Sequence, residues 1–193
     1  QYTDGAGGVP TFTNAGVLKK SAGTSSTIGI TNAFNFVNSG TLSANVGTIN
    51  YAAVNTFNSG TTFNGAGANA VTTNSTFNGT ISSSNLTLQS GSYSGTANLT
   101  GTTTWTGGAM VSGSFTVPAG ATLNVSGGGG PTVDGGGATL TNAGTLNVTG
   151  AANLLINNGA HVVNNGTFDL QTDAGIQYTD GAGGVPTFTN AGV

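Results

Sequence analysis

Charged side chains are almost missing from this chain of 193 residues: they make up 4% of it, and arginine and glutamate are absent. An average soluble domain carries roughly 25%. Lys19 and Lys20 are the only basic residues besides one histidine. Nucleic acids and anionic membranes are bound through clusters of basic side chains. The sequence therefore predicts neither of them as a partner.

Cysteine is absent too, so no disulfide can stabilise the fold. Long hydrophobic runs are lacking, and no stretch approaches the roughly 18 apolar residues of a membrane-spanning helix. Gln1 does not open a basic-then-apolar signal peptide. Stability must come from packing and backbone pairing, and no membrane insertion is expected in this segment.

Glycine, threonine and asparagine are abundant instead, and together they make up nearly half of the chain. Such a bias is also found in disordered proteins, which is the alternative here. Disordered chains, however, combine low hydrophobicity with high charge. Here hydrophobic residues make up 36% and alternate with polar ones, which favours a packed β structure.

The opening segment, residues 1–17, returns letter for letter at the end as residues 177–193. The distance from Gln1 to Gln177 is therefore a repeat length. We divide the chain into one full repeat, residues 1–176, and the start of the next identical repeat, residues 177–193. The sequence is expected to be an excerpt from a longer protein.

A shorter rhythm lies inside this repeat. Glycines at turns (Gly16, Gly40, Gly60, Gly79, Gly101, Gly120, Gly144, Gly166 and Gly192) divide it into eight steps of about 22 residues. A period of this size in a β-rich sequence is typical of a solenoid, whose units bury their apolar faces by stacking. Interruptions at residues 64–76 and 127–138 are expected to be bulged loops.

Asparagine lies two positions before the glycine in five of the eight coils. Both residue types tolerate left-handed backbone angles, which suits a sharp bend between strands. Stacked coils would also align the amides in a ladder. The predicted turn and ladder residues are Asn14, Asn38, Asn58, Asn142 and Asn164, with Gly16, Gly40, Gly60, Gly144 and Gly166.

Short strands with alternating apolar residues follow the turns. A period of two places one face inside and the other outside. The predicted inward residues are Leu42, Ile49, Tyr51, Leu86, Leu88, Phe115, Val117, Leu123, Val125, Leu146, Val148, Phe168 and Leu170. These features predict an all-β parallel solenoid of about eight coils, about 38 Å long at roughly 4.8 Å per coil. Its open ends are expected to stack head to tail on neighbouring identical repeats.

Segments 140–149 (LTNAGTLNVT), 162–171 (VVNNGTFDLQ) and 115–126 (FTVPAGATLNVS) carry a family resemblance. They resemble coils of very large bacterial surface proteins with a right-handed, pectin-lyase-like parallel β-helix, as in autotransporter passengers and filamentous haemagglutinin-like adhesins. The resemblance implies right-handed coils, export to the bacterial cell surface, and a part in adhesion or cell-to-cell contact.

The same fold class includes polysaccharide lyases and hydrolases, whose chemistry needs paired carboxylates or an acidic metal site with a base. One repeat contains only four aspartates, Asp4, Asp134, Asp169 and Asp173. Asp169 and Asp173, with Asp180 after them, are interpreted as surface turn residues. The sequence predicts no enzyme and no cofactor.

A calcium-binding Gly-Gly-x-Gly-x-Asp repeat would need aspartate where Thr132 stands, so no metal site is predicted. His161 lacks a second ligand nearby and is interpreted as a surface side chain. Trp105 is expected in the core rather than against a sugar ring. The Lys19–Lys20 pair is interpreted as a solvated edge that discourages lateral strand pairing.

Two functions are compatible with these features. The first is a structural repeat of an extracellular bacterial surface fibre or stalk. Its expected partners are identical neighbouring repeats, laterally associated copies, and host or cell-surface glycans. The alternative is a binding module whose flat Thr/Asn-rich face holds carbohydrate or ice. That face would need Thr-x-Thr in register over successive coils, as at Thr11/Thr13, Thr102/Thr104 and Thr139/Thr141.

Overall fold

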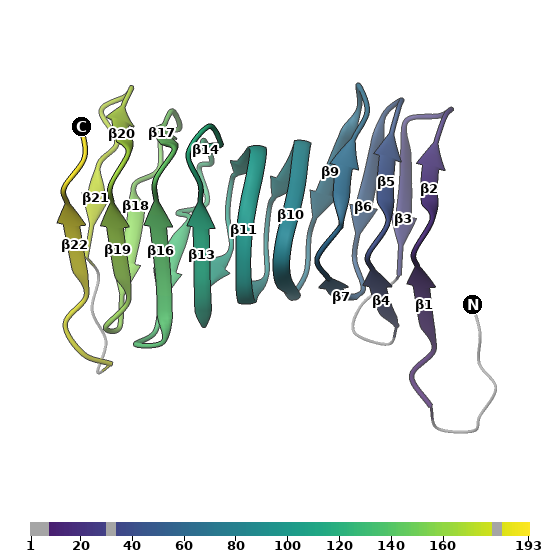
Figure 1. The fold of residues 1–193 in the computed structure, drawn as a ribbon, viewed down its shortest axis with the longest axis horizontal. Coiled ribbons are helices and arrows are strands. Elements are labelled where there is room, and N and C mark those ends of the chain that lie inside the picture. The colour runs from purple at the N-terminus through teal and green to yellow at the C-terminus, as the bar shows by residue number, and fades with distance from the viewer. Residues whose placement is uncertain (1–7, 30–33, 179–182) are drawn as a thin grey trace.

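A computed structural model describes residues 8–29, 34–178 and 183–193. These residues form 22 β-strands and loops and no helix, and the strands pair in parallel throughout. The chain winds into a solenoid of about eight turns, about 22 residues apart (Figure 1). The predicted all-β parallel solenoid is confirmed. Asp4 and Asp180 lie outside the described residues.

Each turn contributes strands to three faces. Face 1 contains β1 (Thr11–Asn14), β4 (Asn35–Asn38), β7 (Val54–Phe57), the starts of β10 (Ser75–Leu88) and β11 (Ser92–Trp105), β12 (Ala109–Met110), β15 (Thr132–Asp134), β18 (Leu154–Asn157) and β21 (Ile176–Gln177).

Face 2 contains β2 (Val17–Lys20), β5 (Thr41–Ala44), β8 (Thr62–Asn64), the middle of β10 and β11, β13 (Gly113–Val117), β16 (Ala138–Asn142), β19 (His161–Asn164) and β22 (Thr187–Asn190). Face 3 contains β3 (Ser25–Ile28), β6 (Thr48–Tyr51), β9 (Ala68–Val71), the ends of β10 and β11, β14 (Thr122–Val125), β17 (Thr145–Val148) and β20 (Thr167–Leu170).

The core consists of columns of side chains in register. One column on face 3 is Ile28, Tyr51, Val71, Leu88, Trp105, Val125, Val148 and Leu170. Trp105 is fully buried in it, as predicted. Because parallel strands keep alternate residues inward, each coil covers the apolar row of the one before. The predicted inward residues are buried, except Phe168 and Leu170 in the last complete coil.

The two segments expected as bulged loops, 64–76 and 127–138, each contain a strand. β9 (Ala68–Val71) lies in the first and β15 (Thr132–Asp134) in the second. The glycines there precede or follow the strands without breaking the stack. Gly67, for example, donates its N–H to the Ala44 carbonyl in the previous coil.

β10 and β11 are the longest strands, with 14 residues each, and they change where the coil bends. Before them, sharp bends at residues 14–16, 38–40 and 58–60 join face 1 to face 2. After them, bends at residues 142–144 and 164–166 join face 2 to face 3. The turn glycines therefore follow two corners of the solenoid, with Gly79 and Gly101 inside the long strands.

This change of corner separates the two copies of the identical segment. β1 lies on face 1, where it pairs with β4, whereas β22, which has the same sequence, lies on face 2, where it pairs with β19. The ninth strand of face 1 is β21, where Gln177 stands in the column that Thr11 begins. Eight turns are thus complete at Gln177, whereas the sequence repeat of Thr11 is Thr187. The difference between these two positions corresponds to the step from face 1 to face 2.

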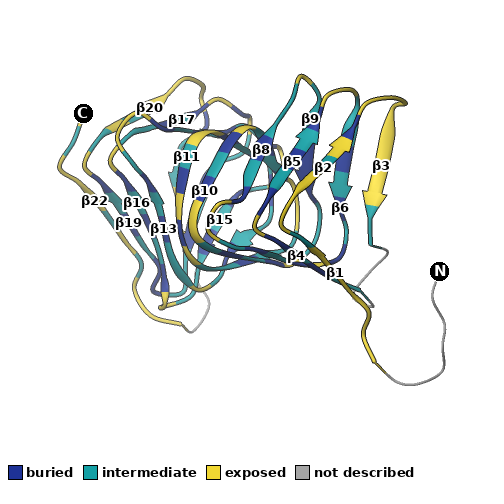
Figure 2. Cartoon of the chain, turned by 45° about the vertical axis from the view of Figure 1, so that its right-hand side comes forward, coloured by how far each residue is buried: buried dark blue, intermediate teal, exposed yellow. Residues whose placement is uncertain are grey.

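Exposed apolar side chains gather at the two ends of the solenoid, whose outermost coils are the least buried (Figure 2). Phe12 is 38% exposed in the first coil, and Leu170 is 50% exposed in the eighth. Phe36 and Val148, the partners of Phe12 and Leu170 in inner coils, are fully buried. Among the described residues, the core side chains of the end coils are thus less buried than those of the inner coils.

Candidate functional site

The most regular polar feature is a pair of asparagine ladders at the bends. In the last coils, Asn142 Nδ2 donates to Asn164 Oδ1, and Asn164 Nδ2 donates to Asn190 Oδ1, both at 2.6 Å. In the first coils, Asn14 Nδ2 donates to Asn38 Oδ1 at 2.7 Å. Each ladder runs along the solenoid axis at a corner where strands end.

Burial makes these bonds important. Asn38, Asn142 and Asn164 are fully buried, and an unpaired amide in such a place would cost free energy. Each side chain also binds the backbone: Asn38 and Asn164 donate to the carbonyls of Gly40 and Gly166, and Asn142 donates to that of Thr167. The hydrogen bonds of the ladder thus link each bend to the bends of the neighbouring coils.

Asn58 does not join the first ladder, contrary to the single aligned set that we expected. Phe57 is the residue opposite Asn38 in the pairing of β4 with β7, and Asn58 comes one position later. Thr61 takes the place instead, and its Oγ1 accepts from Asn38 Nδ2 at 3.0 Å. Asn58 accepts from Asn78 Nδ2.

The predicted turn glycines differ in what excludes a side chain from them. Among the five, only Gly60 has a positive φ, 94°. At Gly40, Gly144 and Gly166 a Cβ would overlap carbonyl oxygens of the coil before, such as that of Gly16 against Gly40. At Gly16 the same position is open. Close stacking therefore excludes a side chain at Gly40, Gly144 and Gly166, whereas the positive φ disfavours one at Gly60.

A second polar cluster, inside the solenoid, was not predicted. The Tyr51 hydroxyl donates to Asn69 Oδ1 at 2.7 Å, and Asn69 Nδ2 donates to Asn85 Oδ1 at 2.8 Å. Asn85 Nδ2 in turn donates to three backbone carbonyls, including that of Gly67. Burial raises the pKa of Tyr51. The sequence signal was an asparagine at position 69, which the alternation of β9 assigns to the inside.

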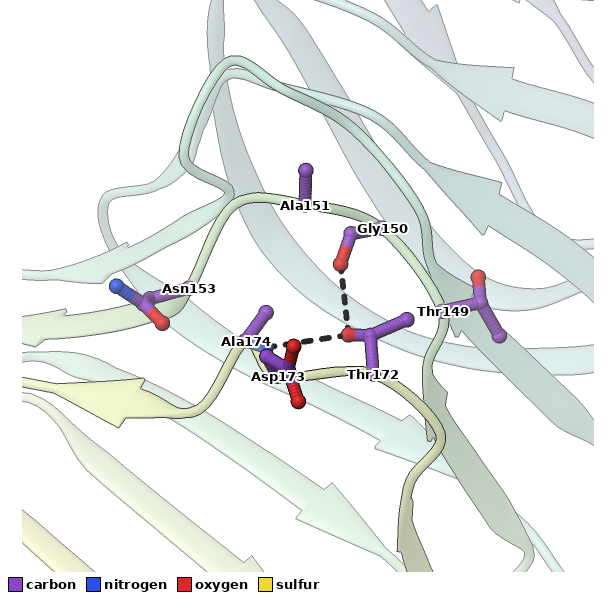
Figure 3. Close-up of a pocket in the computed structure, with 7 residues that line it drawn as sticks. All are labelled: Thr149, Gly150, Ala151, Asn153, Thr172, Asp173 and Ala174. Atoms are coloured by element: carbon purple, nitrogen blue, oxygen red, sulfur yellow. Dashed lines mark hydrogen bonds between the residues drawn. The ribbon is translucent and has the colours of Figure 1, made fainter.

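Figure 3 shows a shallow hollow between the loops that follow β17 and β20. It is lined by Thr149, Gly150, Ala151, Asn153, Thr172, Asp173 and Ala174. Thr172 Oγ1 donates to the Gly150 carbonyl at 2.8 Å, and Asn153 Oδ1 accepts from the Gly175 N–H. These bonds tie the two loops together, and Asp173 is the single ionisable group in the lining.

The described residues contain no group of three or more His, Cys, Asp or Glu side chains placed to hold a metal ion. Nor does any helix in the described part of the chain have the length and apolarity to cross a membrane. The single histidine, His161, lies on face 2, where its Nδ1 is 2.7 Å from Thr187 Oγ1.

The two lysines differ from the solvated pair that we expected. Lys19 is exposed, but Lys20 is 8% exposed, and its Nζ donates to the Ala22 carbonyl. The cause is the alternation of β2, since Lys20 pairs with the buried Ala44 and Lys19 pairs with Ser43 on the outside. Asp169 is exposed on β20 and accepts from Gln171 Nε2.

Threonines line up on face 3. Thr102, Thr122, Thr145 and Thr167 are consecutive partners across β11, β14, β17 and β20. Beside them, two positions along each strand, stand Thr104, Asn124, Asn147 and Asp169. The result is one threonine column next to a mixed polar column, and not two threonine columns.

Comparisons with protein-family models, with curated proteins and with solved structures found no match for this chain.

Proposed function

We propose that this chain is a structural repeat of an extracellular bacterial surface fibre, a stiff rod that supports adhesion or contact between cells. The observation that carries the proposal is the pairing of the segment that occurs twice. The first copy, β1, pairs along one edge with β4. The second copy, β22, pairs along its opposite edge with β19. One sequence thus has bonding partners on both of its edges.

Joining these two halves gives a continuous ladder. Asn142 and Asn164 lead to Asn190, whose counterpart Asn14 donates to Asn38. A following repeat would extend the ladder across the junction without a change of residue type. Neighbouring identical repeats are therefore the proposed partners, arranged head to tail.

The outer surface supports a role as a spacer. Most outward residues on the faces are uncharged, with Lys19 and Asp169 among the exceptions, and the hollow near Asp173 offers one ionisable group. Uncharged stacked coils avoid the repulsion that like charges in register would cause. The location at the bacterial surface and the glycan partners rest on the family resemblance, and protease treatment of intact source cells would test the location.

Chains of two, three and four copies test the fibre directly by electron microscopy. Each copy adds eight coils and one further strand, so the expected rods grow by about 40 Å per copy. Strings of separate compact particles would contradict the proposal. The rods should also resist bending over this length, because the hydrogen bonds run along the axis.

The threonine column supports a second candidate, a face that binds carbohydrate or ice. Thr102, Thr122, Thr145 and Thr167 stand in register, at about the 4.8 Å spacing of neighbouring strands. Thermal hysteresis and glycan-array measurements on the purified chain test it. Loss of a signal in Thr122→Val and Thr145→Val, but not in the control Thr116→Val on face 2, would favour this function.

A further inference from the structure

The exposed edge of β20 (Thr167–Leu170) begins to pair with the end of the chain. Val193 N donates to the Gly166 carbonyl at 2.8 Å, and Phe168 N donates to the Val193 carbonyl at 2.7 Å. Two such bonds from one residue to both sides of its partner define a parallel bridge. They fix the register, with Val193 opposite Thr167.

The repeated segment identifies the residues that come after this bridge in another copy. Val193 corresponds to Val17, which begins β2 and is followed by Leu18, Lys19 and Lys20. In β2, Leu18 points inward because it pairs with the buried Leu42. Lys19 points outward, and Lys20 points inward.

We propose that the edge of β20 binds the β2 strand of a second copy, in the register that Val193 sets. Leu18 of that copy then lies over Phe168, Lys19 over Asp169, and Lys20 over Leu170. This inference rests on the proposed function, since it requires a further copy, and it names the surface and the contacts that join the two.

The inward residues of the two strands match. Phe168 pairs with the buried Leu146, and Leu170 pairs with the buried Val148, yet Leu170 is itself 50% exposed. Leu18 extends the column of Leu146 and Phe168. The methylene stem of Lys20 covers Leu170, while its ammonium group reaches out of the core, as long basic side chains do at the border of apolar surfaces.

The outward residues match in charge. Asn124, Asn147 and Asp169 form the outer column of face 3, and Lys19 is the next residue in that column. The chain has only two lysines, and this register brings one of them beside a carboxylate. An exposed ion pair adds little stability, so its effect is to select the register. A shift by two positions would place Lys19 opposite Thr167 or Gln171.

The proposal places the second copy on a different face. β2 belongs to face 2 in the first coil, whereas β20 belongs to face 3. This offset is the one that β1 and β22 already display on faces 1 and 2. Both strands of the junction therefore advance by the same single face.

A tandem chain tests the register, with residues 18–193 of a second copy joined directly after Val193. Asp169→Cys in the first copy and Lys19→Cys in the second introduce the only two thiols, since the natural chain has no cysteine. Directly opposed residues on neighbouring strands lie about 4.8 Å apart, within the Cα range of a disulfide. We expect nearly complete oxidation to a disulfide, seen as a shift in gel mobility.

The matched control pairs Asp169→Cys with Val193→Cys, two positions out of register and too far apart for the bond. A disulfide in the control, or none in the test pair, overturns the proposal. A second measurement introduces no thiols, so it does not depend on whether the cysteine variants fold. In it, carbodiimide should couple the natural Lys19 and Asp169 across the junction. For this, Lys19→Gln in the first copy and Asp169→Asn in the second leave one Lys19–Asp169 pair.

Electron microscopy of the same tandem chains separates the two proposals. Rods that lengthen by about 40 Å per copy without either cross-link would overturn the Lys19–Asp169 register and leave the fibre in place. Separate particles without cross-links would overturn both.

Discussion

At the scale of single residues, the ladder asparagines combine two requirements that are usually in conflict. They are buried as deeply as the aliphatic core, yet the amide of Asn164 is hydrogen-bonded to the amides before and after it. A leucine of similar size would fill the space, but it would leave the neighbouring amides and bend carbonyls unpaired. The cost of that unpairing explains why these positions are polar.

Asn164→Ala tests the ladder. It leaves the Asn142 donor and the Asn190 acceptor without their partner, and we expect a loss of about 2–3 kcal/mol in the free energy of unfolding. Urea denaturation followed by circular dichroism measures it. Asn165→Ala, at the exposed next position, is the control and should change stability by less than about 0.5 kcal/mol. Equal effects of the two variants would argue against the ladder.

Gly166→Ala tests close stacking at the bend. The new Cβ would overlap the Gly144 carbonyl, so the coils must separate, and we expect a loss of about 1–3 kcal/mol. Gly137→Ala is the matched control, because no atom lies within 4 Å of its Cβ position and its φ is not positive. The same urea titration compares the two. If Gly166→Ala is as stable as the control, close stacking does not exclude a side chain at this bend.

At the scale of strands, alternation in the sequence was sufficient to predict which side chains point inward. Leu123, Val125, Leu146 and Val148 are examples, because each strand is short, flanked by turn residues and half polar. Alternation could not predict the register between coils. Asn58 misses the position opposite Asn38 by one place, which depends on loop lengths and not on the strands themselves.

The two long strands were the other feature beyond prediction. Gly79 and Gly101 continue the spacing of the turn glycines, although neither has an asparagine two positions before it, and they lie within β10 and β11 at φ of 74°. Whether a glycine bends a strand or ends it depends on the coils above and below. The ladder asparagines could be predicted from the sequence. Their division between two corners could not, because it depends on how the coils pair.

Trp105→Ala tests the core at the end of β11. Removing the indole leaves a cavity between Leu88 and Val125, and we expect a loss of about 3–5 kcal/mol. Thr104→Ala, outward on the same strand, is the control. In the natural chain, Trp105 is the only tryptophan, so its fluorescence should be blue-shifted when folded and shift red in a single urea transition. A red-shifted native spectrum would contradict the buried position.

At the scale of the whole molecule, very few groups titrate, so stability should depend little on pH near neutrality. At alkaline pH two groups matter, Tyr51 and Tyr93, because burial raises their pKa values. The folded state thus holds these protons more tightly than the unfolded state, in which tyrosine titrates near pH 10. The contribution is complete below about pH 10 and is lost as the pH rises above it.

We therefore expect the free energy of unfolding to fall above pH 10, by about 1.4 kcal/mol per pH unit for each of the two groups. Urea titrations between pH 7 and 12 measure this slope. Tyr93→Phe should remove about half of it. An identical slope in the Tyr93 variant would show that its hydroxyl is not the one that resists ionisation.

β22 repeats the sequence of β1 but lies on face 2 instead of face 1. This displacement determines the directions in which the surface patches of a fibre face. In a rod built as proposed, any surface patch reappears one face further round in each successive repeat. It returns to its original side after three repeats, about 25 coils or about 120 Å. Such a rod offers the same patch to all directions around it, in a spiral. Two rods lying side by side could not match identical stripes along their whole length, which disfavours flat bundles and favours single fibres or twisted pairs.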